Sequence, residues 1–183
     1  LEEQYGALFR APANLVERDS YTLPGINQYV GGLAVSGGHV YVGGWSMGPK
    51  PGFVILNATD PDNVVWEGDY TAMFRDYGPV AVVGTYAYVG DRTGSALTIF
   101  DVSNRTSPAW IATVPFSNGG SAQQIVATGG YAYAAAGIAG IEIFDVEPPA
   151  GASRVGGSNP PYMNAYQVEH HGGFAYVLAN DTG

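Results

Sequence analysis

The densest cluster of side chains that could do chemistry is Glu169-His170-His171, near the end of the sequence. Carboxylate and imidazole groups bind divalent metals and transfer protons. In an extended strand Glu169 and His171 would share one face, because side chains alternate with a period of two. No third ligand follows at a recognisable spacing. The cluster is therefore either a ligand or metal site or a polar innermost strand that faces a water-filled channel.

A second candidate is Ser46 in the segment GWSMG, which matches the G-x-S-x-G nucleophile elbow of α/β-hydrolases. That elbow needs a helix directly after the serine. Pro49 and Pro51 prevent such a helix here. We therefore expect a loop at Ser46, and we assign no catalytic residue in the chain.

Three N-x-T sequons could accept glycans in an exported protein, and they begin at Asn57, Asn104 and Asn180. The first two are expected in turns that follow a strand. Asn57, Asp101 and Asp145 also recur at one point of a repeated pattern, where such side chains bond the backbone just downstream. Repeated carboxylates could also bind calcium, although their spacing matches no EF-hand loop.

Composition excludes several function classes. Seven Lys and Arg against sixteen Asp and Glu give a net charge of -9, so the clustered cations that nucleic acid needs are missing. The absence of cysteine excludes disulfides, thiol nucleophiles and zinc-thiolate sites. Leu1 begins a stretch without a basic-then-apolar leader, which suggests a removed or omitted signal peptide. The uncharged stretch 125–141 breaks at glycines into two strand-length pieces, so no transmembrane segment is expected.

Four segments repeat along the chain: VSGGHVYVGG, VVGTYAYVGD, ATGGYAYAAA and EHHGGFAYVL. Their anchor tyrosines follow one another at 43 to 47 residues and are Tyr41, Tyr88, Tyr133 and Tyr176. A glycine stands four positions before each anchor, which predicts a hairpin turn at Gly37, Gly84, Gly129 and Gly172. Alternating aromatic and small residues after each turn predict strands.

Each unit contains four strand-like pieces with Gly- and Pro-rich turns and no helical period, which is the pattern of a propeller blade. We therefore predict an all-β chain of about four four-stranded blades of ~45 residues. Residues 1–27 would be an extended segment that could supply an outer strand. The blades would occupy 28–74, 75–120, 121–162 and, incompletely, 163–183.

Residues 87–108 (AYVGDRTGSALTIFDVSNRTSP) resemble the LVIVD repeat, and the resemblance extends over about residues 12–183. It implies a β-propeller of the microbial cell surface, mostly without assigned chemistry. Two arrangements remain open. The chain is either part of a larger propeller or a closed four-blade ring completed by the N-terminal segment.

These observations predict an extracellular or cell-surface module that binds or assembles and does not catalyse. Its partners would be a protein, a glycan or further copies of itself. Recognition would use exposed loops, with Tyr29, Trp45, Tyr77 and Tyr166 as candidate contacts. One alternative is a structural subunit of a surface filament or lattice. The other is a metal-dependent hydrolase that uses Glu169, His170 and His171. No cofactor is expected unless calcium or another divalent metal binds.

Overall fold

The computed structural model describes residues 23, 30–45, 51–71, 75–160 and 163–181. Within them, strands alternate with tight turns, and the helical elements are two short 3-10 turns, η1 (Ser117–Gly119) and η2 (Pro149–Gly151). The prediction of an all-β chain is therefore confirmed. No helix among these residues is long and apolar enough to cross a membrane.

The strands form four antiparallel sheets, and in each sheet consecutive strands are neighbours. We call these sheets blades 1 to 4. Blade 1 contains β1 (Val30–Ser36), β2 (His39–Gly44), β3 (Pro51–Asn57) and β4 (Val65–Thr71). Blade 2 contains β5 (Tyr77–Val83), β6 (Tyr86–Asp91), β7 (Ala96–Asp101) and β8 (Ala109–Pro115). Blade 3 contains β9 (Gln124–Thr128), β10 (Tyr131–Ala135), β11 (Ile141–Asp145) and β12 (Ser153–Ser158). Blade 4 contains two strands in the described part, β13 (Met163–His171) and β14 (Phe174–Asp181).

The turns that join the first two strands of each blade have the predicted backbone. The four predicted glycines all adopt a positive φ between 57° and 59°, and they are Gly37, Gly84, Gly129 and Gly172. This left-handed region strains residues that carry a Cβ, which explains why glycine recurs there.

The third strand of each complete blade ends in a side-chain turn. The Asn57 and Asp101 side chains accept hydrogen bonds from the backbone N–H groups two residues downstream, at 3.0 Å and 2.8 Å. Asp145 accepts one from Glu147 at 3.0 Å. The turn interpretation of these three residues is therefore confirmed.

Each blade packs one face on the next blade. The face that covers the preceding blade is called the back face, and the face that the following blade covers is the front face. Tyr41 and Phe53 on the front of blade 1 pack with Val89 and Phe100 on the back of blade 2. The Phe53 and Phe100 rings are stacked with centroids 4.8 Å apart. Equivalent apolar clusters join blade 2 to blade 3 and blade 3 to blade 4.

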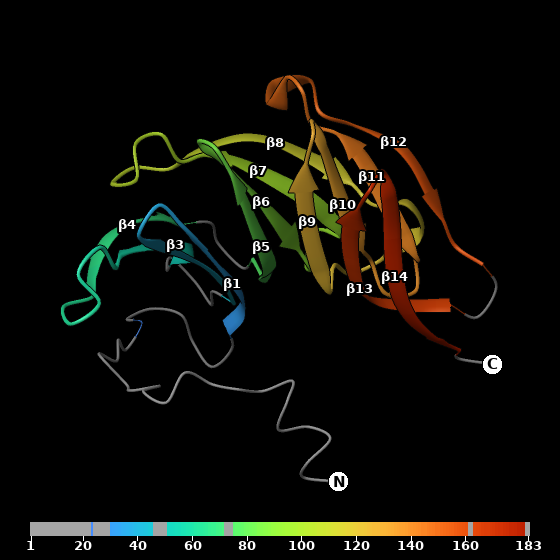
Figure 1. The fold of residues 1–183 in the computed structure, drawn as a ribbon, viewed down its shortest axis with the longest axis horizontal. Coiled ribbons are helices and arrows are strands. Elements are labelled where there is room, and N and C mark those ends of the chain that lie inside the picture. Colours follow the sequence, from blue (N-terminus) through green and yellow to red (C-terminus); the bar gives the residue numbers. More distant parts are fainter. Residues whose placement is uncertain (1–22, 24–29, 46–50, 72–74, 161–162, 182–183) are drawn as a thin grey trace, which may run out of the picture.

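The inner strands set the path of the molecule. Strand β5 packs on β1 and β2, β9 packs on β5 and β6, and β13 packs on β9 and β10. Figure 1 shows the resulting arc of sheets, which runs from β1 in blue to β14 in red. No comparable packing of β13 on β1 occurs within the described residues. The described part of the chain is therefore an open arc of blades.

Candidate functional site

The structure places the Glu169-His170-His171 cluster on β13 and divides it between two faces. The His170 ring lies on the back face and stacks on Tyr133 of blade 3, with centroids 5.1 Å apart. Glu169 lies on the opposite face and accepts a hydrogen bond from Gln124 Nε2 at 3.3 Å. In the part of the chain that the structure describes, no group of three His, Cys, Asp or Glu residues could hold a metal ion.

Gln124 joins blade 3 to blade 4 through both ends of its amide. Its Nε2 donates to Glu169, and its Oε1 accepts a hydrogen bond from Val168 N at 3.0 Å. Gln124 therefore ties β9 to β13, through the Val168 backbone and the exposed Glu169 side chain.

The four predicted loop contacts lie in different environments. Tyr29 is outside the described residues, as is Ser46. Trp45 is partly exposed and forms an isolated bridge with Asp76. Tyr77 is not in a loop but begins β5, where it is buried and packs edge-on against Phe100 at 5.7 Å. Tyr166 is exposed on β13, and its hydroxyl accepts a hydrogen bond from Asn164 Nδ2.

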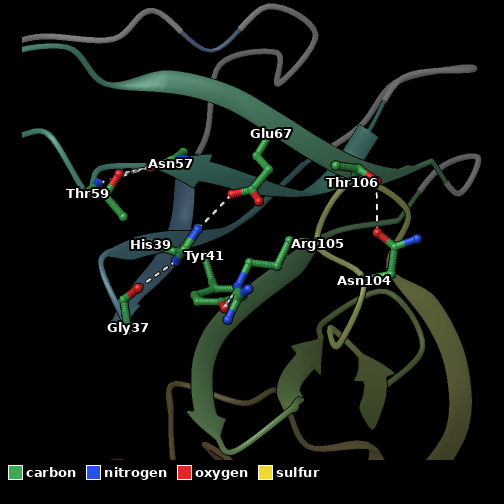
Figure 2. A network of polar contacts seen from close by, with 9 residues as sticks. All are labelled: Gly37, His39, Tyr41, Asn57, Thr59, Glu67, Asn104, Arg105 and Thr106. Atoms are coloured by element: carbon green, nitrogen blue, oxygen red, sulfur yellow. Dashed lines mark hydrogen bonds and ion pairs between the residues drawn. The ribbon is translucent and has the colours of Figure 1, made fainter.

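Two of the three sequons lie in exposed turns on the same side of the first blades (Figure 2). Asn57 Oδ1 accepts a hydrogen bond from Thr59 Oγ1 at 2.6 Å, and Asn104 Oδ1 accepts one from Thr106 Oγ1 at 2.8 Å. In both turns the threonine hydroxyl donates to the side-chain carbonyl oxygen of the asparagine. The side-chain amide nitrogen of the asparagine takes no part in this contact. Asn180 is exposed on β14, and its sequon ends beyond the described residues.

Figure 2 also shows how blade 1 is tied internally and to blade 2. His39 Nδ1 lies 2.7 Å from Gly37 O, and its Nε2 lies 2.9 Å from Glu67 Oε2 on β4. The Glu67 Oε2 atom is buried, and its contact with His39 lacks the angles of a good hydrogen bond. Arg105 Nε, from the loop after β7, donates to the Tyr41 hydroxyl at 3.1 Å. Of these contacts, the one between Arg105 and Tyr41 joins blade 2 to blade 1.

The groove between blades 1 and 2 contains a pocket of about 370 Å³. Aromatic side chains from three strands line it, namely Tyr70, Tyr77 and Trp110. Four polar side chains complete the lining, namely Arg75, Asp91, Thr98 and Thr113. Burial is the main cause that raises the pKa of Tyr77, and the nearby Asp91 adds to it. The Tyr77 hydroxyl is therefore a neutral group at physiological pH.

The two ends of the arc carry a different kind of surface. On β1, Leu33 is 61% exposed, whereas the equivalent back-face residues Val80 and Ile125 are 7% and 5% exposed. On β14, Tyr176 is 59% exposed, although the anchor tyrosine of blade 1 is 1% exposed. Both ends therefore present faces that the same repeat buries elsewhere in the molecule.

Blades of one strand order that pack face to face in an arc define a β-propeller-type repeat protein. The LVIVD repeat model matches residues 75–114 and 119–168, which contain blade 2, blade 3 and the start of blade 4. The chain thus belongs to the LVIVD-repeat family, as its sequence suggested. No curated protein matches the sequence.

Two solved structures of designed proteins are similar in fold. The computationally designed Ika4 protein aligns with a TM-score of 0.60 at 10% identity, over 88% of this chain and 96% of that one. The computationally designed Ika8 protein aligns with a TM-score of 0.59 at 10% identity, over 82% of this chain. The alignment spans 42% of the Ika8 chain, so the chain described here matches less than half of that larger protein.

Proposed function

We propose that the chain is a non-catalytic binding and assembly module of the cell surface or extracellular space, and that it assembles by packing its end blades on further copies. The observation that carries this proposal is the exposure of matched positions at the two ends of the arc. Leu33 and Tyr176 are more than half exposed. At the equivalent positions inside the arc, Val80, Ile125, Tyr41 and Tyr88 are buried and Tyr133 is half-buried.

The two open surfaces are the two halves of the interface that the molecule already repeats. Inside the arc, each of the inner strands β5, β9 and β13 packs on the first two strands of the preceding blade. The strand β1 of a second copy would thus pack on β13 and β14 of the first. Its exposed row, Leu33 and Val35, would meet the exposed row Phe174, Tyr176 and Leu178. This contact is head-to-tail, so it produces closed rings or open filaments.

The open face of blade 1 and the open face of blade 4 also agree in width. On the back face of blade 1, the middle strands are covered: Val42, Val54 and Leu56 form a buried cluster that includes Leu23. The inner strand β1 remains open. Blade 4 presents two strands in its described part, which is the width that an inner strand contacts inside the arc.

The contact between copies is expected to be weaker than the internal ones. Leu178 occupies the position of Gly43 and Gly90, where a Cβ would lie 2.4 Å and 2.6 Å from atoms of the next blade. The Leu178 side chain therefore prevents a second copy from approaching blade 4 as closely as the blades approach one another at Gly43 and Gly90. Association should be reversible and concentration-dependent.

Sedimentation velocity over a range of protein concentrations tests the proposal. The unmodified chain should associate, and Tyr176→Lys should remain monomeric because it places a charge in an apolar contact. Val155→Lys is the matched control, since Val155 is 54% exposed, close to the 59% of Tyr176, but lies on the outer strand β12. A monomeric unmodified chain, or equal effects of the two lysine variants, would overturn the proposal.

The location outside the cell rests on surface chemistry. Charged residues make up 13% of the chain, against roughly 25% in average soluble domains. The exposed sequon at Asn104 supports the same location, because such turns are accessible to a glycosyltransferase.

A further inference from the structure

The pocket between blades 1 and 2 exists because one position of the repeat changes its residue. Thr98 on β7 faces Val89, and Glu142 on β11 faces the equivalent Ala134. In blade 3, the Glu142 carboxylate is fully buried and bonds Ser117 Oγ and Arg154 Nε. The shorter Thr98 reaches only Thr113 Oγ1, at 3.2 Å. The space that the Glu142 side chain fills in blade 3 stays open in blade 2.

The floor of this pocket offers hydrogen-bonding groups without net charge. Asp91 is 2% exposed, and its Oδ2 accepts a hydrogen bond from Arg75 Nη1 at 2.7 Å. Its Oδ1 accepts another from Gly94 N at 2.8 Å. A Cβ at Gly94 would lie 2.7 Å from Asp91 Oδ2 and 2.9 Å from Arg75 Nη1, so a larger residue would displace the ends of these two side chains. Asp91 and Arg75 together present both acceptors and donors as a neutral pair.

The wall of the pocket is aromatic and held in place. Trp110 is 52% exposed, and its Nε1 donates to Thr113 Oγ1 at 3.0 Å, which fixes the ring. Tyr70, on the opposite side of the groove, packs against Phe100 with centroids 4.9 Å apart. The groove therefore combines one flat apolar face, the Trp110 indole, with a buried polar pair, which is the combination that small-molecule sites use.

We infer that this pocket binds a neutral saccharide of one or two rings. The apolar C–H face of a sugar would stack on Trp110, and adjacent hydroxyls would exchange hydrogen bonds with the Asp91–Arg75 pair. The volume lies at the lower end of the roughly 300–1,000 Å³ that small-molecule sites occupy. Anionic ligands are disfavoured, because the cation that lines the pocket is already paired and the chain carries a net charge of -9.

The test is saturation-transfer NMR followed by calorimetric titration with methyl glycosides of glucose, galactose, mannose and N-acetylglucosamine and with their disaccharides. Glucuronate is the anionic comparator. At least one neutral sugar should bind saturably to the unmodified chain. Trp110→Ala should weaken that binding at least tenfold. Tyr131→Ala removes an exposed aromatic residue of blade 3 outside the pocket and should leave the affinity unchanged.

Thr98→Gln is a second variant that should weaken sugar binding. Its longer side chain should occupy the pocket, as the Glu142 side chain occupies the equivalent space in blade 3. Circular dichroism and the melting temperature establish that each variant is folded. The inference fails if no neutral sugar saturates the chain, if glucuronate binds best, or if Trp110→Ala binds as well as the unmodified protein. Titrating Tyr176→Lys as well separates this result from that of the assembly proposal, since its pocket is intact.

Discussion

At the scale of single residues, the clearest electrostatic contrast is between the pKa values of two aspartates. Asp76 lies just before β5, and Asp101 ends β7. Burial raises the pKa of Asp76, partly opposed by Arg92 and supported by Asp91. One of its carboxylate oxygens, Oδ1, is buried without a hydrogen-bond partner. Hydrogen bonds from Ser103 instead lower the pKa of Asp101, which lies in an exposed turn. The two carboxylates should therefore contribute to stability with opposite signs.

For Asp76, a folded pKa above the unfolded one means that ionisation opposes folding. Asp76→Asn should raise the urea midpoint at pH 7, and the gain should vanish once acid has protonated Asp76 in both states. Asp101→Asn is the control of opposite sign, because its ionised form stabilises the fold at neutral pH and that contribution is lost as pH falls through the lowered pKa. Denaturation curves at a series of pH values from 7 downward measure both effects. A lower midpoint for Asp76→Asn at pH 7 would contradict the assignment.

Residue-level reasoning from sequence located the turn side chains and the sequons, because their chemistry is local. It did not find Asp91, Thr98 or Trp110 as lining one pocket. These residues come from three strands, and their proximity depends on how the strands pair and how blade 1 packs. The one signal in the sequence was the exchange of Thr98 for Glu142 at a single position of the repeat.

At the scale of the blade, the distance between sheets depends on small residues in the second strand. A Cβ at Gly43 would lie 2.4 Å from the Gly78 carbonyl oxygen and 3.1 Å from that of Tyr77. Both are backbone atoms of β5, so neither can move without shifting blade 2. The close contact of inner strands therefore requires glycine at this position.

Gly43→Ala should consequently lower the free energy of unfolding by about 1–3 kcal/mol, the range for overpacked cores. Gly156→Ala in β12 is the matched control, because no atom lies within 4 Å of the added methyl group. That variant should be neutral or slightly more stable, since alanine restricts the unfolded chain. Urea denaturation compares the two. Equal stability of both variants would show that the blades can separate without cost.

The blade itself was predictable from the sequence for a physical reason. Hairpin glycines, alternating side chains and strand-end Asx turns are all set by residues within one unit, and the unit recurs. The open front face of blade 4 was not predictable in this way. Tyr176 carries the same residue type as its buried equivalents Tyr41 and Tyr88, and only the structure distinguishes it by its exposure.

At the scale of the whole molecule, the arc combines a repeated apolar interface with open ends and a strongly acidic surface. The net charge of -9 makes copies of the chain repel one another. Salt screens this repulsion, since the Debye length is about 10 Å at 0.1 M ionic strength. Association should therefore strengthen as salt is added. An interface held by opposite charges would instead weaken as salt is added. The direction of the salt effect therefore distinguishes an apolar interface from a charged one.

The most direct measurement of head-to-tail assembly is sedimentation velocity on a mixture of two variants. Leu33→Lys blocks the face of β1 and leaves β14 intact, whereas Tyr176→Lys does the reverse. Each variant alone should stay monomeric, and an equimolar mixture should form a dimer and nothing larger, because one intact pair of faces remains. A mixture that stays monomeric while the unmodified chain associates, or self-association of either variant alone, would contradict assembly through these two faces.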